Sequence, residues 1–169
     1  SLSPDVVDCI IFWSKNPEPL LKYIDEISKN YTFYFQFTLN TYEKDLEPNL
    51  PSLEERMLTF KILSEKFGQD RVIWRYDPVI LSEKYTIEWH INCFRSIADQ
   101  LANYTTSCVF SFVDVYDKIK NNLKSVNMIP FTTADINEIA SNFSEIAHSH
   151  SLILKTCAED FDLQKYGIE

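Results

Sequence analysis

The sequence predicts an α/β fold in which about five strand–helix units form an incomplete TIM-like barrel or an open parallel sheet. Five short apolar segments end in polar residues, and apolar residues at helical spacing separate them. Alternation of strands and helices favours a parallel sheet with right-handed crossovers. A complete eight-unit barrel takes roughly 250 residues. The incomplete barrel and a five-stranded doubly wound sheet therefore stay open as alternatives.

The third apolar segment shows the pattern most clearly. It runs into Arg75 and Asp77 and stops at Pro78. Because side chains on a strand alternate between faces, Arg75 and Asp77 share one face, and Trp74 and Tyr76 share the other. Proline donates no ladder hydrogen bond and restricts the residue before it, so we expect the strand to end there.

The second segment has the most regular alternation and predicts that Phe33, Phe35 and Phe37 face helices. The expected strands are residues 6–13, 31–40, 72–77, 108–113 and 152–157.

Local signals mark the helices between these strands. Ser52 and Glu55 have the spacing of a capping box, Thr132 and Asp135 can cap the last helix, and Gly68 is expected to close the second. A short helix is also expected over residues 116–126. The helical stripes comprise Leu20, Leu21, Ile24, Ile27; Leu53, Met57, Phe60, Phe67; Ile87, Ile91, Phe94, Ile97, Leu101; and Ile136, Ile139, Phe143, Ile146.

Composition limits the classes of function. The 169 residues are 45% hydrophobic, which suits one domain with a substantial core, expected here as the central part of a longer protein. The net charge of −9 and dispersed lysines disfavour general nucleic-acid and anionic-membrane binding. No apolar run reaches bilayer length, and two glycines are too few for a clustered phosphate-binding loop. A small-molecule ligand is the partner that fits, and the sequence does not indicate an oligomeric state.

The four cysteines, Cys9, Cys93, Cys108 and Cys157, lack the spacing of a zinc or iron–sulfur site, so no metal ligands are predicted. We expect reduced, buried thiols in a cytoplasmic protein. His90 lies in a helical pattern, where a surface or half-buried structural role is expected.

Polar residues at the strand ends are the candidates for a ligand site, because parallel α/β folds bind ligands there. Arg75 is the strongest candidate: a buried arginine needs either a ligand carboxylate or phosphate, or an internal partner among Asp77, Asp114 and Glu159. Asp77 can accept protons or bind an amine, or be an ordinary turn residue. Lys15 can be an amine of lowered pKa or a solvated strand-end lysine. The full candidate set is Lys15, Gln36, Thr38, Arg75, Asp77, Asp114 and Glu159.

Five blocks of sequence resemble an uncharacterised microbial family, domain of unknown function 1848. They are residues 12–17, 34–39, 47–51, 72–78 and 156–159, in the family's order. The resemblance implies a barrel-like domain that, in full-length members, precedes a cysteine-rich region similar to those of radical S-adenosylmethionine and spore-photoproduct-lyase-like proteins. S-adenosylmethionine and an iron–sulfur cluster are then expected in the full-length protein, with no cofactor held by this chain itself.

Three hypotheses of function follow. The leading one is the substrate- or cofactor-binding barrel portion of a radical S-adenosylmethionine-like enzyme whose cysteine cluster lies outside this chain, which alone is expected to be inactive. The second is a non-catalytic α/β module that binds a small anionic or zwitterionic metabolite. The third is a structural scaffold with internal ion pairs.

Overall fold

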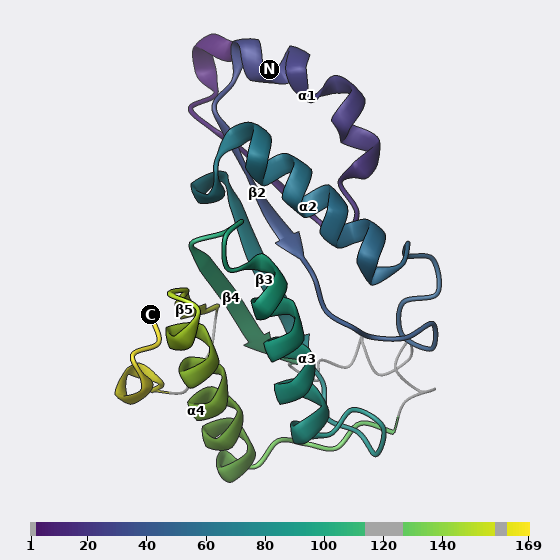
Figure 1. Ribbon diagram of the computed structural model, residues 1–169, viewed down its shortest axis with the longest axis vertical. Coiled ribbons are helices and arrows are strands. Elements are labelled where there is room, and N and C mark those ends of the chain that lie inside the picture. Colours follow the sequence, from purple (N-terminus) through teal and green to yellow (C-terminus); the bar gives the residue numbers. More distant parts are fainter. Residues whose placement is uncertain (1–2, 114–126, 158–161) are drawn as a thin grey trace.

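The computed structural model describes residues 3–113, 127–157 and 162–169 (Figure 1). Within these ranges, five strands form one sheet in the order β1-β2-β3-β4-β5, and each strand pairs with the next in parallel. The predicted α/β fold with an open parallel sheet is confirmed. The strands are β1 (Ile10–Ser14), β2 (Phe33–Thr38), β3 (Val72–Val79), β4 (Ser107–Phe112) and β5 (Ile153–Thr156).

The helices follow the strands in strict alternation, and those of the described ranges cover one side of the sheet (Figure 1). Strand order equals chain order, so each crossover steps in the same direction, as in a TIM barrel. A doubly wound sheet reverses direction and places helices on both faces. The described sheet is singly wound, which favours the partial-barrel alternative. The helices are α1 (Leu21–Asn30), α2 (Leu53–Phe67), α3 (Ile87–Leu101) and α4 (Thr133–Ser149).

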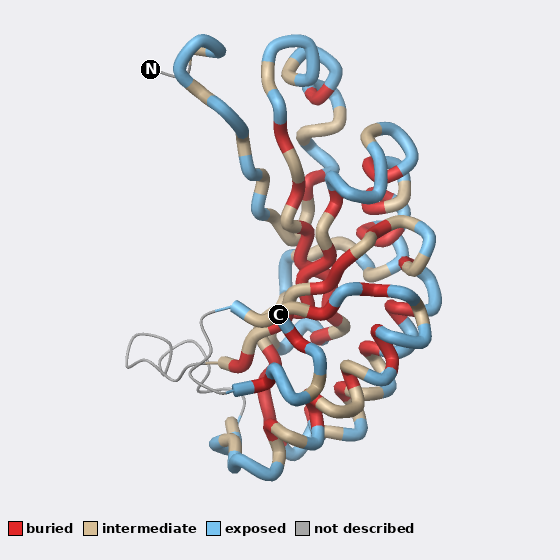
Figure 2. Tube along the Cα trace, turned by 90° about the vertical axis from the view of Figure 1, so that its left-hand side faces the viewer, coloured by how far each residue is buried: buried red, intermediate tan, exposed pale blue. Residues whose placement is uncertain are grey.

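The core lies between the sheet and the helix layer (Figure 2). As predicted, Phe33, Phe35 and Phe37 are buried there, as are Trp74 and Tyr76 of β3. The opposite face of the sheet, which would line the interior of a closed barrel, is covered by none of the described helices. Here it is called the inner face. Its edge strands expose large apolar side chains, namely Ile11 (52%), Trp13 (60%) and Ile153 (48%).

The sequence signals for helix ends are confirmed. Ser52 and Glu55 form a reciprocal capping box at the start of α2, and Thr132 and Asp135 do the same for α4. Gly68 ends α2 with a φ of 98°, a conformation that favours glycine. The helix expected over 116–126 lies outside the described residues.

The predicted start of the first strand was wrong. Residues Pro4–Val6 form a 3₁₀ turn, Val6 is exposed, and β1 begins at Ile10. Pro4 favours a turn start, and Ile10 is the first residue with a partner on β2, where it pairs with Phe33.

The predicted end of the third strand was also wrong. β3 continues through a cis Asp77–Pro78 bond to Val79, with an irregular register against β4 between Tyr76 and Val79. A proline is tolerated at such an irregularity because the strand needs no N–H donor there.

The chain adds one further residue beside β5. The amide of Glu169 donates to the carbonyl of Leu154, and the amide of Thr156 donates to the carbonyl of Glu169. These bonds flank Lys155 as in a parallel ladder, and the Lys155 ammonium also pairs with the Glu169 carboxylate at 2.7 Å. Glu169 therefore lies alongside Lys155 at the outer edge of β5.

Two expectations about reactive side chains need correction. His90 is fully buried because its ring nitrogens bond to the Tyr76 hydroxyl (2.9 Å) and the Ile80 carbonyl (2.8 Å), which replace water. The cysteines are free thiols, but Cys9 and Cys157 are exposed, since neither lies among the helix-facing positions of a strand. None of the described helices is long and apolar enough to cross a membrane.

Candidate functional site

The candidate site begins with three polar side chains that meet on the inner face. Arg75 lies in β3 beside β2, and its Nη1 donates to Gln36 Oε1 at 2.7 Å. Its Nε and Nη2 donate to Asp77 Oδ2 at 2.9 and 2.7 Å. Arg75 is only 3% exposed. Of the two predicted alternatives for Arg75, the structure contains the internal ion pair, with Asp77 as the partner.

Two residues outside the predicted set complete this group. The indole of Trp13 lies 4.1 Å from the Arg75 guanidinium carbon, and its Nε1 donates to Thr38 Oγ1 at 3.4 Å. Ser111 of β4 donates to Asp77 Oδ1 at 2.5 Å. We call this group the inner-face cluster; it comprises Trp13, Gln36, Thr38, Arg75, Asp77 and Ser111.

The charges of the inner-face cluster balance, and its ion pair is hydrogen-bonded at both carboxylate oxygens. Both carboxylate oxygens of Asp77 accept hydrogen bonds, one set from Arg75 and one from Ser111. The Arg75 cation is stabilised by this carboxylate and by the indole face of Trp13. Trp13 nevertheless remains 60% exposed, so a planar group can stack on the cluster from outside.

Lys15, the remaining described candidate, lies apart from the cluster. It follows β1 directly, and its ammonium pairs with Glu47 of the loop after β2. Glu47 is nearly buried, with an 8% exposed side chain, and its other oxygen lies 3.9 Å from Nη2 of Arg56. Lys15 therefore takes part in a second polar group at the carboxyl ends of β1 and β2.

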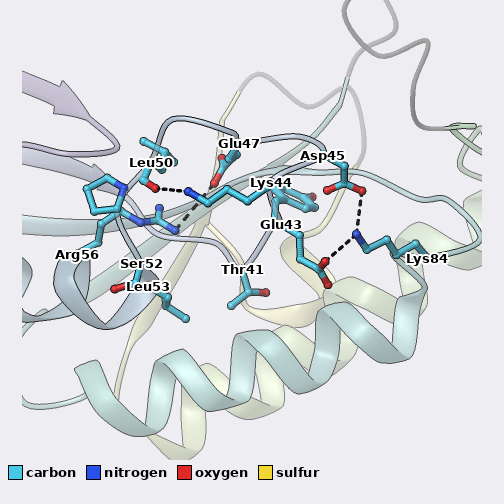
Figure 3. A pocket seen from close by; sticks show the side chains of 12 residues that line it. Thr41, Glu43, Lys44, Asp45, Glu47, Leu50, Ser52, Leu53, Arg56 and Lys84 are labelled. Carbon is cyan, nitrogen blue, oxygen red and sulfur yellow. Dashed lines mark hydrogen bonds and ion pairs between the residues drawn. The ribbon is translucent and has the colours of Figure 1, made fainter.

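This second group borders a cavity of about 580 Å³ (Figure 3). Its walls come from the β2–α2 loop, the first turns of α2 and Lys84, which lies between β3 and α3. Arg56 and Glu47 lie on one side of the cavity, and Lys84 lies on the other (Figure 3). The side chain of Arg56 is 3% exposed.

Several buried polar atoms beside the cavity lack a hydrogen-bond partner among the described residues. They are Nε and Nη1 of Arg56, Oε2 of Glu47 and Oγ1 of Thr41, which line the cavity, and Oδ1 of Asn40, the residue before Thr41. Arg56 Nη2 alone of its nitrogens is engaged, donating to the Asn40 carbonyl at 3.1 Å. Burial lowers the pKa of the Arg56 guanidinium, and Glu47 opposes that shift.

Asn40 connects the two groups. Its side-chain amide donates to the Asp77 carbonyl at 3.2 Å, while its own carbonyl accepts from Arg56. Asn40 is fully buried. The inner-face cluster and the cavity wall are therefore joined through one hydrogen-bonded residue.

Four hydrogen-bonded side chains lie on the far side of the cavity and are here called the clasp: Glu43, Asp45, Lys84 and Tyr85. Lys84 Nζ donates to Asp45 at 2.8 Å and to Glu43 at 3.0 Å, and the Tyr85 hydroxyl donates to Asp45 at 2.6 Å. The bonds to Asp45 and Glu43 raise the pKa of Lys84. Hydrogen bonds from Lys84 and Tyr85 lower the pKa of Asp45. This clasp ties the β2–α2 loop to the segment after β3.

The structure brings Gln36, Thr38, Arg75 and Asp77 together as predicted, and places Lys15 on Glu47 instead. The predicted candidates Asp114 and Glu159 lie outside the described residues.

The residues that sequence reasoning missed left partial signals. Ser111 interrupts an apolar strand, and its register beside β3 puts it on the same face as Asp77. Arg56 follows Leu53 by three residues and precedes Phe60 by four, so it shares the buried stripe of α2. Glu47 belongs to one of the family-like blocks. Strand alternation places Asn40 on the same face as Gln36 and Thr38, which was the signal for it.

Among the described residues, no group of three or more His, Cys, Asp or Glu side chains is arranged to hold a metal ion. The polar groups that do converge are hydrogen-bonding and charged side chains.

The described residues form a singly wound, open parallel sheet arranged as in part of a β/α barrel, with polar side chains gathered toward the carboxyl ends of its strands. The sequence model of the family described as Domain of unknown function (DUF1848) matches residues 1–169, so the chain belongs to that family. A search of curated proteins found no match. The resemblance to that family is confirmed, and the likeness to radical S-adenosylmethionine proteins stays a prediction.

Proposed function

We propose that this chain is the substrate- or cofactor-binding portion of a β/α-barrel enzyme, with the inner-face cluster turned toward a small anionic or zwitterionic ligand. The observation that carries the proposal is the buried Arg75, held by Asp77 and Gln36 on the helix-free face. Ligands of barrel enzymes bind at the carboxyl ends of the strands.

The chemistry of the cluster supports a ligand role over a purely structural one. A buried ion pair contributes little net stability relative to well-packed apolar residues. The helix-facing side of β3 is apolar, with Val72 and Trp74 fully buried, whereas the inner side carries the ion pair. Trp13 adds an exposed ring over the guanidinium, which suits stacking of a planar group such as a nucleobase.

S-adenosylmethionine is a narrower form of this proposal, which comes from the family resemblance. It combines a nucleobase with a zwitterionic amino-acid group, and both match the ring and charges of the cluster. An iron–sulfur cluster does not fit the described part of this chain, because its cysteines do not form a ligand set. Closely spaced cysteines after Glu169 in the gene would support this form.

A non-catalytic metabolite-binding module is the second candidate. The observation that favours it is that both oxygens of Asp77 are engaged, by Arg75 and Ser111, so the carboxylate has no unengaged oxygen for proton transfer. The two candidates differ in the fate of the ligand. Mass spectrometry of S-adenosylmethionine incubated with the full-length protein under reducing conditions decides: conversion supports the enzyme, and recovery of intact ligand supports the module.

Calorimetric titration with S-adenosylmethionine and S-adenosylhomocysteine tests the binding proposal. We expect saturable binding to the chain and about tenfold or greater weakening by Arg75→Gln, which corresponds to about 1.4 kcal/mol. The matched control is Arg71→Gln, because Arg71 is an exposed arginine in the 3₁₀ turn that precedes β3. Trp13→Ala, at an exposed position, supplies a second variant if Arg75→Gln does not fold. Absence of binding, or binding that neither variant weakens, contradicts the proposal.

A further inference from the structure

We propose that the cavity beside Arg56 and Glu47 is a second ligand site, which takes the zwitterionic head of an α-amino acid: carboxylate toward Arg56 and ammonium toward Glu47. This site is separate from the inner-face cluster, since none of the cluster residues lines the cavity.

The inference rests on two oppositely charged side chains, Arg56 and Glu47, that have hydrogen-bonding atoms without partners among the described residues. Two nitrogens of a guanidinium that is 3% exposed have no acceptor in the described ranges, and one oxygen of a carboxylate that is 8% exposed has no donor there. Buried polar groups are normally satisfied, because an unmet donor or acceptor costs free energy. The closest approach of the two side chains, 3.9 Å between Arg56 Nη2 and Glu47 Oε2, is longer than a hydrogen bond.

The two groups are prevented from satisfying each other. Glu47 is held by Lys15 through its Oε1, and Arg56 is held through Nη2 by the Asn40 carbonyl. A molecule that brings both an acceptor and a donor satisfies both residues at once. A carboxylate and an ammonium on one carbon have this combination.

The charge of the cavity favours a ligand with no net charge. Its walls contain three cationic side chains, Lys44, Arg56 and Lys84, and three anionic ones, Glu43, Asp45 and Glu47. Lys84 is already paired with Glu43 and Asp45, and Lys44 donates to the carbonyls of Pro48 and Leu50. A dianion such as phosphate would add two negative charges to this balanced lining and would face Glu47 as well as Arg56.

The remaining walls indicate an apolar side chain. Leu50, Pro51 and Leu53 line the cavity beside the charged pair, as Figure 3 shows for Leu50 and Leu53. The volume of about 580 Å³ lies within the range of roughly 300–1,000 Å³ typical of small-molecule sites. Leucine and methionine are the natural first probes.

The test compares a zwitterion with its two halves on the wild-type chain. Calorimetric titration uses L-leucine, 4-methylpentanoate, which lacks the ammonium, and 3-methylbutylamine, which lacks the carboxylate; L-methionine and L-phenylalanine extend the series. We expect saturable binding of at least one of the three amino acids. Compared with that amino acid, the analogue that lacks the ammonium and the analogue that lacks the carboxylate should each bind about tenfold or more weakly. Equal binding of a half-ligand, or no saturable binding by any of the three amino acids at millimolar concentration, overturns the inference.

Variants then assign the binding to this cavity. Arg56→Gln should abolish binding of the amino acid, and Glu47→Gln should weaken it, while the exposed controls Arg95→Gln and Glu88→Gln leave it unchanged. Arg75→Gln should also leave it unchanged, which separates this site from the proposed function. Binding that survives Arg56→Gln and Glu47→Gln, or that Arg75→Gln removes, places the ligand elsewhere and overturns the assignment.

Discussion

Arg75 and Asp77 form an ion pair of 2.7 Å between two side chains of the same strand, two residues apart. Both project to the inner face because side chains of a strand alternate with period two. The pair is largely shielded from water, since the exposed fractions of the two side chains are 4% and 16%. Each charge therefore depends on the other for its stability in the folded chain.

This dependence predicts an asymmetric mutational result. Arg75→Ala should reduce the free energy of unfolding by about 3–5 kcal/mol, because it leaves the Asp77 carboxylate without its counter-charge. The double variant Arg75→Ala/Asp77→Ala should recover part of that loss. Urea denaturation of the wild type, both single variants and the double variant gives the coupling energy. Additive losses in the double variant would show that the two side chains act independently.

Trp13 should stabilise the fold through Arg75. Trp13→Ala removes the ring from the guanidinium and should reduce the free energy of unfolding by about 1 kcal/mol. The same substitution in an Arg75→Gln background should have a smaller effect, and this difference separates the cation–π contact from general packing. Tyr23→Ala, at another exposed aromatic, is the control in both backgrounds. Equal losses in the two backgrounds would assign the effect to packing.

His90 predicts a pH-dependent stability. Burial lowers its pKa from 6.5 to about 4, so the folded chain keeps the ring neutral while the unfolded chain binds a proton below pH 6.5. Stability from this group is therefore fully present above pH 6.5 and is lost as the pH falls toward 4, by ~3 kcal/mol in all. The neutral ring fits its partners, since one nitrogen accepts from the Tyr76 hydroxyl and the other donates to the Ile80 carbonyl.

Urea denaturation between pH 4 and pH 7.5 measures this effect as the difference between the wild type and His90→Gln. Carboxylates that titrate in the same interval contribute to both proteins and cancel in the difference. His148→Gln, at an exposed helix position, should follow the wild type at every pH. A difference between wild type and His90→Gln that does not vary with pH would contradict the buried neutral ring.

Periodicity predicted the fold class because both repeats are local: Phe33, Phe35 and Phe37 alternate within one strand, and Ile136, Ile139 and Phe143 recur along one helix. Strand ends depend on the partner strand, which is distant in sequence. Val6 therefore looked like a strand residue although β2 has no partner for it.

The residues of the candidate site also divide into those that a local pattern could predict and those that depend on distant parts of the chain. Arg75 and Asp77 lie in one strand, so parity alone placed them together. Trp13 and Ser111 join them from β1 and β4, and only the sheet order and register reveal that. Arg56 and Glu47 meet across a helix and an irregular loop, where no periodicity relates the two positions.

Ser111 provides the most selective test of the inner-face cluster, because it contacts Asp77 without contributing a charge. Its hydroxyl donates to Asp77 Oδ1 at 2.5 Å. Ser111→Ala removes that donor and leaves one carboxylate oxygen under-satisfied, which should reduce the free energy of unfolding by about 1–3 kcal/mol. Ser111→Thr keeps the hydroxyl on a β-branched residue suited to a strand and should retain most of the stability. Ser96→Ala, on the exposed side of α3, controls for the loss of a serine as such.

Because Ser111→Ala also frees an oxygen of Asp77, any ligand ammonium that approaches the inner face should bind at least as tightly as before. Calorimetric titration with S-adenosylmethionine checks this second effect, and weaker binding to Ser111→Ala would show that the serine, and not only Asp77, contacts the ligand.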